Sequence, residues 1–357
     1  MALKGAVGYL TVEYKHWWKV MSRVICVGSV AKDIFFPTAE GVFLDTPEDV
    51  MAQRKVAFEV GAKYQIEDRF EALGGVAANM SVGLARLGIP VSCYGGIGND
   101  DIGAWIRREF EREGVDAKLL EEYPGVKSDL SAILTFTGNG ERTIFYNRDS
   151  AERLRVDASK FSGASLVVVS ALNGDWEENI RHAVLGAKNA GAKLAVNPGQ
   201  RNMKDNLSRV LEAVGQADVL LLNKDEAIEL VSGFSRDASS FNDEAFLLRA
   251  LFRHGAKKIA MTDGARGAWG YDGAECFRAT ANRPKRGIDT TGAGDAFGSA
   301  FLAAEMFGKS LAESLRWGVA NGTQVIYSYG AIEGLLRREE VNFRIADISL
   351  ESVIMPS

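Results

Sequence analysis

The stretch G-I-D-T-T-G-A-G-D-A-F, residues 287–297, is the most informative part of this chain. Its small residues Gly292, Ala293 and Gly294 allow the backbone to approach a ligand without a side-chain clash. An apolar helical period follows at once. A turn that leads into a helix N-terminus presents free N–H groups and the positive end of the helix dipole, which favours an anion such as phosphate.

Asp295 directly follows these small residues. A carboxylate in the first turn of a helix can simply cap that helix. Beside backbone groups that favour phosphate, the pattern instead favours a chemical task, namely taking the proton from a hydroxyl that attacks a phosphoryl group. The amides of Gly292, Ala293 and Gly294 would then form an anion hole for the transferred group. The sequence therefore predicts Asp295 as a general base.

A second glycine-rich stretch lies far upstream, in G-G-V-A-A-N-M-S-V-G-L-A-R-L-G at residues 74–88. Together with D-T-T-G-A-G-D at residues 289–295, it resembles the two signatures of the ribokinase-like (phosphofructokinase B) carbohydrate kinases. The resemblance extends from Val24 to Val341. It implies an α/β fold, a three-layer α/β/α Rossmann-like sandwich with a mainly parallel central sheet (the ribokinase-like fold), and a small β-sheet lid.

The pattern of elements agrees with that architecture. Between residues 165 and 262, short apolar runs alternate with helical periods, which predicts parallel strands with helices on both faces. The resemblance places the lid at about residues 34–70 and 130–147, although 34–70 can also be read as an ordinary insertion. The second segment reads as two strands joined at Gly138-Asn139-Gly140, because Asn-Gly is a strong hairpin signal.

The ends of the chain are predicted separately. The kinase domain is expected over residues 21–344, followed by a C-terminal tail over 345–357. Residues 1–20 are interpreted as an N-terminal extension that is not native, with Met21 as the natural start.

Composition excludes several classes of function. The 357 residues carry a formal charge of −5 with a pI near 5.5, which gives no electrostatic signature of nucleic-acid or anionic-membrane binding. No apolar run approaches the ~20 residues that span a bilayer. Three scattered cysteines fit a reducing compartment, so a cytoplasmic protein is expected.

Cation sites follow from the resemblance. Asp289 and Thr291 match positions that help to hold a monovalent cation, usually K⁺, in related kinases, but Asp289 can equally cap a turn. Glu226 belongs to N-K-D-E at residues 223–226, which matches an N-x-x-E element that organises Mg²⁺ through water. As an alternative, Glu226 is a favourable charge at a helix N-terminus.

Nucleotide contacts are implied at several positions. Thr262, Gly264 and Gly267 form the T-x-G-x-x-G turn that contacts nucleotide phosphates and ribose in the family, and Asn223 is expected beside them. Asn321 aligns with a position that lines the adenine pocket, and a purely structural amide is the equal alternative.

The acceptor side is expected to combine five residues. Asp33, in G-x-x-x-x-D at residues 28–33, would accept hydrogen bonds from two acceptor hydroxyls. Gly75 would contribute close backbone approach and Asn79 its amide. Arg142 or Arg148 would recognise a carboxylate or phosphate on the acceptor, although an exposed strand arginine is the common outcome.

These features predict an ATP-dependent, Mg²⁺-dependent sugar kinase. Ala31 and Val76 differ from the ribose-contacting residues usual in ribokinases, so a nucleoside (adenosine-like) kinase is the first alternative. A catalytically silent nucleotide or metabolite sensor is the second. No G-x-G-x-x-G follows the first strand, which argues against a dehydrogenase. The family also suggests a homodimer formed through the lid.

Overall fold

The computed structural model describes residues 23–46, 54–136, 141–282 and 287–355. The predictions for residues 1–20 and for the turn at residues 138–140 therefore lie outside the described residues. In the described part of the chain, no helix has the length and apolarity that crossing a membrane requires.

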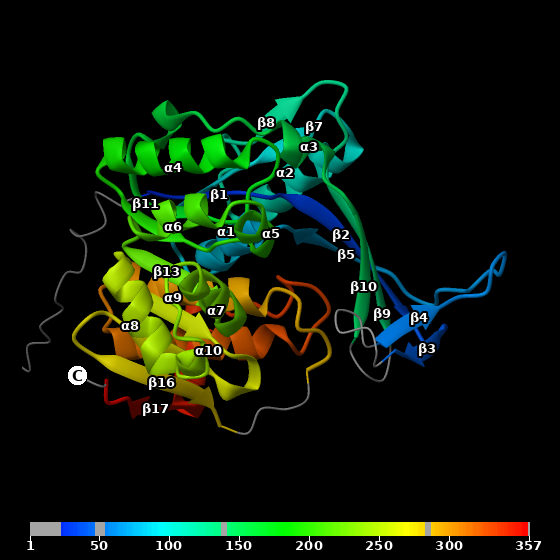
Figure 1. Ribbon diagram of the computed structural model, residues 1–357. Coiled ribbons are helices and arrows are strands. Elements are labelled where there is room, and N and C mark those ends of the chain that lie inside the picture. The colour runs from blue at the N-terminus through cyan, green and yellow to red at the C-terminus, as the bar shows by residue number, and fades with distance from the viewer. Residues whose placement is uncertain (1–22, 47–53, 137–140, 283–286, 356–357) are drawn as a thin grey trace, which may run out of the picture.

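A nine-stranded sheet forms the centre of the molecule (Figure 1). Six strands from β14 to β6 pair in parallel, and three antiparallel strands extend the β14 edge. The spatial order is β17 (Ile348–Ser352), β16 (Cys276–Ala281), β15 (Ala268–Tyr271), β14 (Ile259–Thr262), β13 (Val219–Asn223), β12 (Lys193–Val196), β11 (Ala164–Val169), β1 (Arg23–Val27) and β6 (Val91–Tyr94).

Helices cover both faces of this sheet, and each helical layer buries its own apolar cluster. Strand β1 shows how the sequence builds both clusters. Val24 and Cys26 pack into one cluster while Ile25 and Val27 pack into the other, as the two-residue period of a strand requires. One layer contains α1 (Val76–Arg86), α2 (Asp101–Glu113), α9 (Ala293–Met306) and α10 (Leu311–Val325), and the other contains α4 (Trp176–Ala190), α6 (Leu207–Val214), α7 (Lys224–Ser232) and α8 (Glu244–His254). The shorter helices are α3 (Asp149–Arg153), α5 (Gln200–Asp205) and α11 (Arg338–Arg344).

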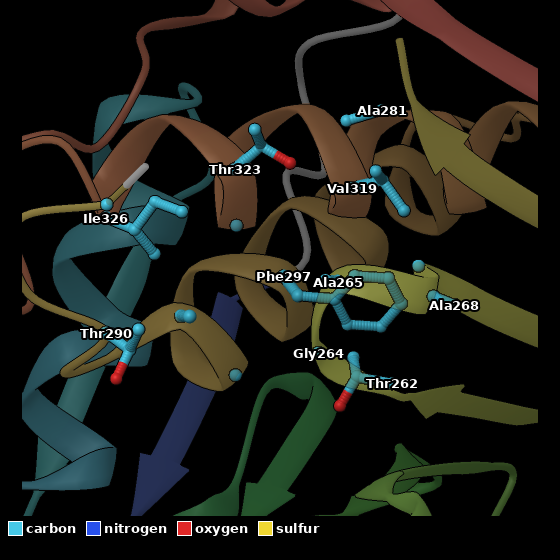
Figure 2. A pocket seen from close by; sticks show the side chains of 15 residues that line it. Thr262, Gly264, Ala265, Ala268, Ala281, Thr290, Phe297, Val319, Thr323 and Ile326 are labelled. Carbon is cyan, nitrogen blue, oxygen red and sulfur yellow. The ribbon is translucent and has the colours of Figure 1, made fainter. Parts of the chain in front are cut away.

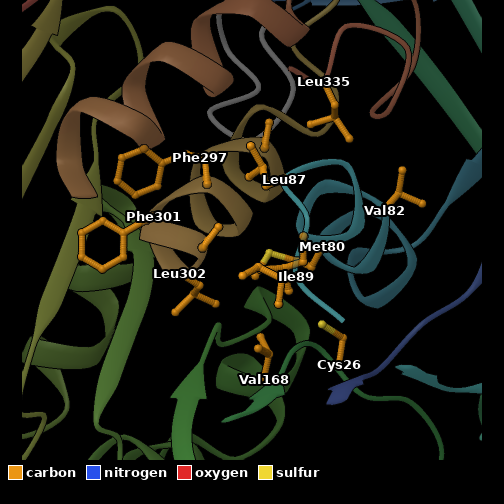
Figure 3. Close-up of a cluster of buried hydrophobic side chains, with 14 of the residues drawn as sticks. Cys26, Met80, Val82, Leu87, Ile89, Val168, Phe297, Phe301, Leu302 and Leu335 are labelled. Atoms are coloured by element: carbon orange, nitrogen blue, oxygen red, sulfur yellow. The ribbon is translucent and has the colours of Figure 1, made fainter. Parts of the chain in front are cut away.

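Helices α1 and α9 pack closely against each other (Figure 3). A Cβ built on Gly83 would lie only 2.2 Å from Ser299 Oγ, so the glycine permits the close approach. One turn earlier on each helix, Asn79 contacts Asp295. In both helices the Gly83 contact lies four residues after the Asn79 contact, so the two helices run parallel. Their N-termini therefore lie side by side. The apolar side chains around this crossing, such as Met80 and Leu302, hold the two helices together.

The expected second sheet projects from one edge of the molecule (Figure 1). It consists of β10 (Arg142–Asn147), β9 (Leu130–Phe136), β2 (Ala31–Thr38) and β5 (Phe70–Gly74), in that order, and is called the lid sheet below. A separate hairpin, β3 (Val42–Asp45) with β4 (Arg54–Ala57), packs against it through Phe43 and Phe136, whose ring centroids lie 5.1 Å apart. The last small pair is β7 (Gly96–Gly98) with β8 (Glu121–Tyr123).

The C-terminal segment differs from the expected tail. Within residues 345–357, β17 pairs antiparallel with β16 and completes the central sheet. Ile348 at its start is 5% exposed and joins the apolar cluster beneath α10. The strand is short and only half-buried, so its apolar pattern is too weak to distinguish it from a tail.

Candidate active site

The N-terminus of α9 is built by glycines with two different tasks. Gly292 caps the helix with a φ of 74°, and a Cβ there would lie 2.3 Å from the Cβ of Ala331. The fold itself therefore requires this glycine. Around Gly294, by contrast, no heavy atom of the described residues lies within 4 Å of a built Cβ. The space beside Gly294 is open for a ligand.

Asp295 lies in the first turn of α9 and is held by α1. Asn79 Nδ2 donates a hydrogen bond of 2.8 Å to Asp295 Oδ2. Burial raises the pKa of Asp295 to about 6, and the hydrogen bond from Asn79 offsets part of that rise. Asn79 is 6% exposed, and its Oδ1 has no hydrogen-bond partner among the described residues. Asp295 thus provides a carboxylate of raised pKa, and Asn79 provides an amide oxygen that is free to accept a hydrogen bond.

The N-terminus of α1 opens toward the same place. Gly75 caps it with a φ of 90°, and a Cβ there would lie 2.4 Å from the carbonyl oxygen of Ser29. Neither glycine cap provides a side-chain acceptor for the first-turn N–H groups. Val76 N donates to the Ser29 hydroxyl at 3.2 Å, and Ala293 N donates to the Thr290 carbonyl at 3.3 Å, so an anion at this place would compete for these two donors. Two helix dipoles therefore point at one position, which favours an anion there.

Asp289 organises the loop before α9. Its side chain is fully buried and accepts hydrogen bonds from the Thr291 backbone (2.9 Å), the Thr291 hydroxyl (2.6 Å) and the Gly330 backbone (3.1 Å). This matches the turn-capping interpretation, and it also brings residues 328–331 beside the loop, as the cation interpretation requires. Arg142 Nη1 lies 3.6 Å from Asp289 Oδ1.

Glu226 and Asn223 form a capping box at the start of α7. Asn223 Oδ1 accepts from Glu226 N, and Glu226 Oε2 accepts from Asn223 N, both at 2.9 Å. Burial raises the pKa of Glu226 to about 7, the Asn223 hydrogen bond lowers it, and the Asp295 carboxylate raises it further. The negative charges of Glu226 and Asp295 thus repel each other, and a cation bound between them would reduce that repulsion. In the described part of the chain, no three acidic, histidine or cysteine side chains form a metal cluster. This donor set suits Mg²⁺, which keeps several waters and relies on phosphate oxygens.

The larger of two adjoining pockets lies between α9, α10 and the end of β14 (Figure 2). Its volume is about 390 Å³, and its walls are mainly apolar. Phe297 projects from α9, Val319 and Thr323 line it from α10, and Thr262 lies at its rim. Gly264 and Gly267 of the predicted nucleotide turn line it too, so the structure brings this turn to the N-terminus of α9.

The glycines of that turn have different constraints. Gly267 has a φ of 92°, and a Cβ there would lie 2.1 Å from the Ala279 carbonyl oxygen. It therefore shapes the turn itself. Gly264 also has a positive φ, 49°, but no described heavy atom lies within 4 Å of its built Cβ. Thr262 Oγ1 donates to the Leu222 carbonyl at 3.4 Å, which ties the turn to β13.

The smaller pocket, about 330 Å³, continues from the first past Thr262, Gly294 and Phe297. Asp295, Glu226 and Asn223 line it, so it joins the predicted base to the predicted Mg²⁺ element. A further part of its lining was not predicted from the sequence, namely Asn197, Pro198, Gly199 and Gln200 at the carboxyl end of β12, the strand beside β13. A polar residue followed by Pro-Gly directly after a buried parallel strand is the signal that would have found it.

Asn321 does not contribute to either pocket. Its Nδ2 donates to the Ala296 carbonyl at 2.8 Å, its Oδ1 accepts from Leu336 N at 2.8 Å, and the residue is fully buried. The amide joins α10 to α9 and to the chain before α11. We therefore assign Asn321 the structural role that the sequence left as an alternative, in place of a nucleotide contact.

The acceptor-side residues gather at the base of the lid sheet. Asp33 is 8% exposed, and burial raises its pKa, whereas the Ser131 hydroxyl and Arg148 lower it. Arg148 is fixed by hydrogen bonds to Ser131 Oγ (2.9 Å) and to the carbonyls of Leu130 and Asn147. Arg148 thus lies near enough to Asp33 to lower the pKa of its carboxyl. Arg142 instead contacts the loop before α9, where its Nη1 donates to Thr290 Oγ1 at 3.1 Å. Asp289 of that loop also raises the pKa of Asp33.

Comparison with known proteins identifies the relatives of this chain. The pfkB family carbohydrate kinases match the chain over residues 50–338. The chain belongs to the pfkB family. It is 27% identical over 286 residues to 5-dehydro-2-deoxygluconokinase of Bacillus subtilis (strain 168), a similarity that covers 75% of this chain and 85% of the relative.

Solved structures show the same fold. The nucleoside kinase of Methanocaldococcus jannaschii, an archaeal member of the ribokinase family, aligns with a TM-score of 0.71 at 20% identity, over 91% of this chain and 98% of that one. A putative ribokinase II from E. coli, in complex with ATP and Mg²⁺, aligns with a TM-score of 0.73 at 18% identity, over 91% and 99%. The predicted ribokinase-like fold with a small extra sheet is confirmed.

Membership of the pfkB family makes this protein a phosphotransferase that acts on a sugar hydroxyl, with ATP as co-substrate. The predictions of family and enzyme class are thereby confirmed.

Proposed function

We propose that this pfkB kinase transfers the γ-phosphoryl group of ATP to an acceptor hydroxyl at the junction of the two pockets, with Asp295 as the general base. The observation that carries the proposal is the position of Asp295. It lies where the α1 and α9 N-termini meet, lines the pocket that continues from the apolar one, and has a pKa raised to about 6 by burial. A base of that pKa is ionised at neutral pH and still basic enough to assist proton removal.

The larger pocket suits the adenosine part of ATP. Its apolar walls would enclose the base, with Phe297 and Val319 on two sides, and Thr262, Gly264 and Gly267 border the path of the phosphates. The γ-phosphoryl group would then reach the amides of Gly292, Ala293 and Gly294 at the start of α9. Backbone donors fixed in advance stabilise the charge that builds on the equatorial oxygens during transfer.

Asp295 would accept the proton of the attacking hydroxyl. Asn79 holds the carboxylate in place with Nδ2, and its unpaired Oδ1 is available to accept a hydrogen bond from the acceptor. Asp33 would accept hydrogen bonds from acceptor hydroxyls, and Arg148 near it gives this wall both signs of charge. Holding the hydroxyl between base and phosphoryl group supplies the proximity on which this chemistry depends.

Mg²⁺ would be held beside Glu226 through water, with Asn223 keeping the carboxylate oriented. The ion would neutralise phosphate charge during transfer. Asp289 and Thr291 remain the proposed site for K⁺, together with the turn at residues 328–331.

The acceptor is proposed to be a sugar or sugar acid, because the curated relative above phosphorylates 5-dehydro-2-deoxygluconate by name and Arg148 is a fixed cation beside Asp33. A nucleoside is the second candidate, favoured by apolar Val76 in the wall of the smaller pocket and by the nucleoside kinase fold. A panel of neutral sugars, sugar acids and nucleosides, assayed for ADP release, separates the two. ATP binding without turnover on any acceptor would instead support the sensor interpretation.

Two further features of the protein stay proposals. Exposed apolar side chains lie on β10 of the lid sheet and on the β3–β4 hairpin, among them Ile144, Phe145, Tyr146 and Val42, which supports a homodimer formed through the lid. A cytoplasmic location agrees with the three buried free cysteines in the described chain.

The pH dependence of catalysis is the first testable consequence. Asp295 must be ionised to accept a proton, so kcat/KM, measured at saturating Mg²⁺ to keep Glu226 ionised, should be constant well above pH 6 and fall as the pH drops through about 6. Asn79→Ala removes a donor that stabilises the ionised form, and the acid limb should therefore move to higher pH. The profile is measured on both proteins with the acceptor selected by the panel. An unchanged acid limb in Asn79→Ala would contradict this assignment of the limb to Asp295.

Asp33→Asn tests the acceptor wall. A carboxylate accepts from two hydroxyls, whereas the amide offers only one acceptor oxygen, so the KM of the acceptor should rise by about 10- to 100-fold, the cost of a hydrogen bond to a charged group. The KM of ATP should stay unchanged, because Asp33 lines neither pocket at the α9 N-terminus. Steady-state kinetics with each substrate varied in turn decide the matter. An equal rise in the KM of ATP would refute an acceptor-specific role.

A further inference from the structure

Two side chains of the lid sheet contact the loops around the α9 N-terminus. From β10, Arg142 Nη1 donates to Thr290 Oγ1 at 3.1 Å and lies 3.6 Å from Asp289 Oδ1. From β5, the ring of Phe70 stacks on Tyr329, with centroids 5.2 Å apart and planes 18° apart. The first contact reaches the loop before the amides, and the second reaches the neighbouring turn.

The loop and the turn that receive these two contacts are joined to each other by hydrogen bonds to Asp289. Asp289 accepts from Thr291 N in the loop and from Gly330 N in the turn, and Gly330 directly follows Tyr329. Thr290 lines the pocket proposed for adenosine. A displacement of the lid sheet therefore acts on the same backbone that begins the anion hole.

We infer that Arg142 is a positioning residue that couples the lid sheet to nucleotide binding, by joining β10 to the Thr290–Asp289 loop. The inference rests on the proposed function, because it takes the larger pocket as the nucleotide site. It replaces the expectation that Arg142 binds the acceptor. The guanidinium is committed to the loop, whereas Arg148 is the arginine beside Asp33.

Charge and burial explain why this contact has an effect. Asp289 is 1% exposed, and Arg142 is a cation within ion-pair distance of it. A buried carboxylate stabilises its surroundings only when its charge is compensated. The loop is therefore most stable when the lid sheet places Arg142 beside Asp289. In turn, the position of the lid sheet is most stable when the loop is ordered.

The coupling must act in both directions. Whatever stabilises the loop, including nucleotide phosphates at the α9 N-terminus, must also stabilise the position of β10, because coupling free energies between two sites are reciprocal. Nucleotide alone, without acceptor, should consequently protect the lid sheet from opening.

Hydrogen exchange measured by mass spectrometry tests this on the full chain. Adding the ATP analogue AMP-PNP with Mg²⁺ to the natural protein should slow amide exchange in β9 and β10 by at least about fivefold, the lower end of typical site-to-site coupling. In Arg142→Met most of that nucleotide-dependent protection should disappear. AMP-PNP binding, followed by calorimetry, should persist in this variant.

Arg54→Met is the matched control. Arg54 lies in β4 beside the lid sheet, and its ion pairs with Asp45 (3.6 Å) and Glu141 (3.5 Å) stay within the lid region. Its loss should leave the nucleotide-dependent protection intact. Equal loss in both variants would overturn the inference, because a general loosening of the lid region would then explain it.

The remaining outcomes are distinct. Protection of β9 and β10 that survives in Arg142→Met would overturn the inference alone. Loss of AMP-PNP binding in Arg142→Met would also overturn it, since Arg142 would then contact the nucleotide directly. Absence of AMP-PNP binding in the natural protein would overturn the proposed nucleotide pocket and the inference together.

Discussion

Asp295→Asn is expected to lower kcat by about 10²–10⁴-fold, the usual contribution of a general base. The amide keeps the size and the hydrogen-bonding position of the carboxylate beside Asn79, but it cannot accept a proton at neutral pH. The KM of ATP should change little, because the larger pocket is untouched. Steady-state ADP release, measured with the acceptor selected by the panel, gives both quantities.

Thermal unfolding provides the control for this variant. Burial raises the pKa of Asp295 above its ordinary value, so the ionised carboxylate costs folding free energy at neutral pH. This cost is complete above the folded-state pKa of about 6, shrinks as the pH falls below it, and disappears near the ordinary pKa of 3.8, where the carboxyl of the unfolded chain also becomes protonated. The asparagine variant should therefore unfold at the same or a higher temperature than the natural protein. A variant that unfolds early, or one that retains near-full turnover, would contradict the assignment.

Gly294→Val is expected to lower kcat/KM for ATP by about 10²–10³-fold, comparable to the loss of an oxyanion donor. The valine side chain would occupy the open space that both pockets share beside Gly294, where the phosphoryl group must approach. Because no described heavy atom lies within 4 Å of the built Cβ, the fold should tolerate the change. Kinetics and thermal unfolding are measured on the same preparation.

Gly292→Val is the matched comparison, only two positions away. There a side chain meets a φ of 74° and a built Cβ lies 2.3 Å from Ala331, so stability and activity should fall together. The pair separates a glycine that the ligand requires from a glycine that the fold requires. If Gly294→Val destabilised the protein as much as Gly292→Val, the open space beside Gly294 would have no catalytic meaning.

Local patterns predicted the parts of this structure that depend on neighbouring residues. The strand–helix alternation predicted the parallel sheet because the buried strands are continuous apolar runs bounded by turns. The glycine stretch at residues 287–297 predicted a turn entering a helix, and α9 begins there at Ala293. Asn223 and Glu226 form the helix start that an N-x-x-E spacing allows.

Contacts between distant residues were beyond such reasoning. The sequence places Asn79 in a motif but says nothing of its hydrogen bond to Asp295 on another helix, which depends on how closely Gly83 lets α1 approach Ser299. Asn321 reads equally as a ligand contact or a structural amide until Ala296 and Leu336 are seen to satisfy it.

The partner of the charged side chain of Arg142 also could not be predicted from the sequence. An arginine on a strand can face an acceptor, solvent or another loop, and sequence alone does not choose among them. The choice is made by the path of β10, which carries the side chain to Thr290 rather than to Asp33. The lining at residues 197–200 was not predicted because it depends on how the ends of β12 and β13 come together beside the smaller pocket.

The central claim is that Asp295 faces the transferred phosphoryl group across the space of one hydroxyl. A crystal structure of the protein with AMP-PNP and Mg²⁺ tests it most directly. We predict the terminal phosphate at the amides of Gly292–Gly294, with the Asp295 carboxylate beside it and room for a single acceptor oxygen between them. A terminal phosphate bound away from the α9 N-terminus, or an Asp295 side chain turned from it, would contradict the account.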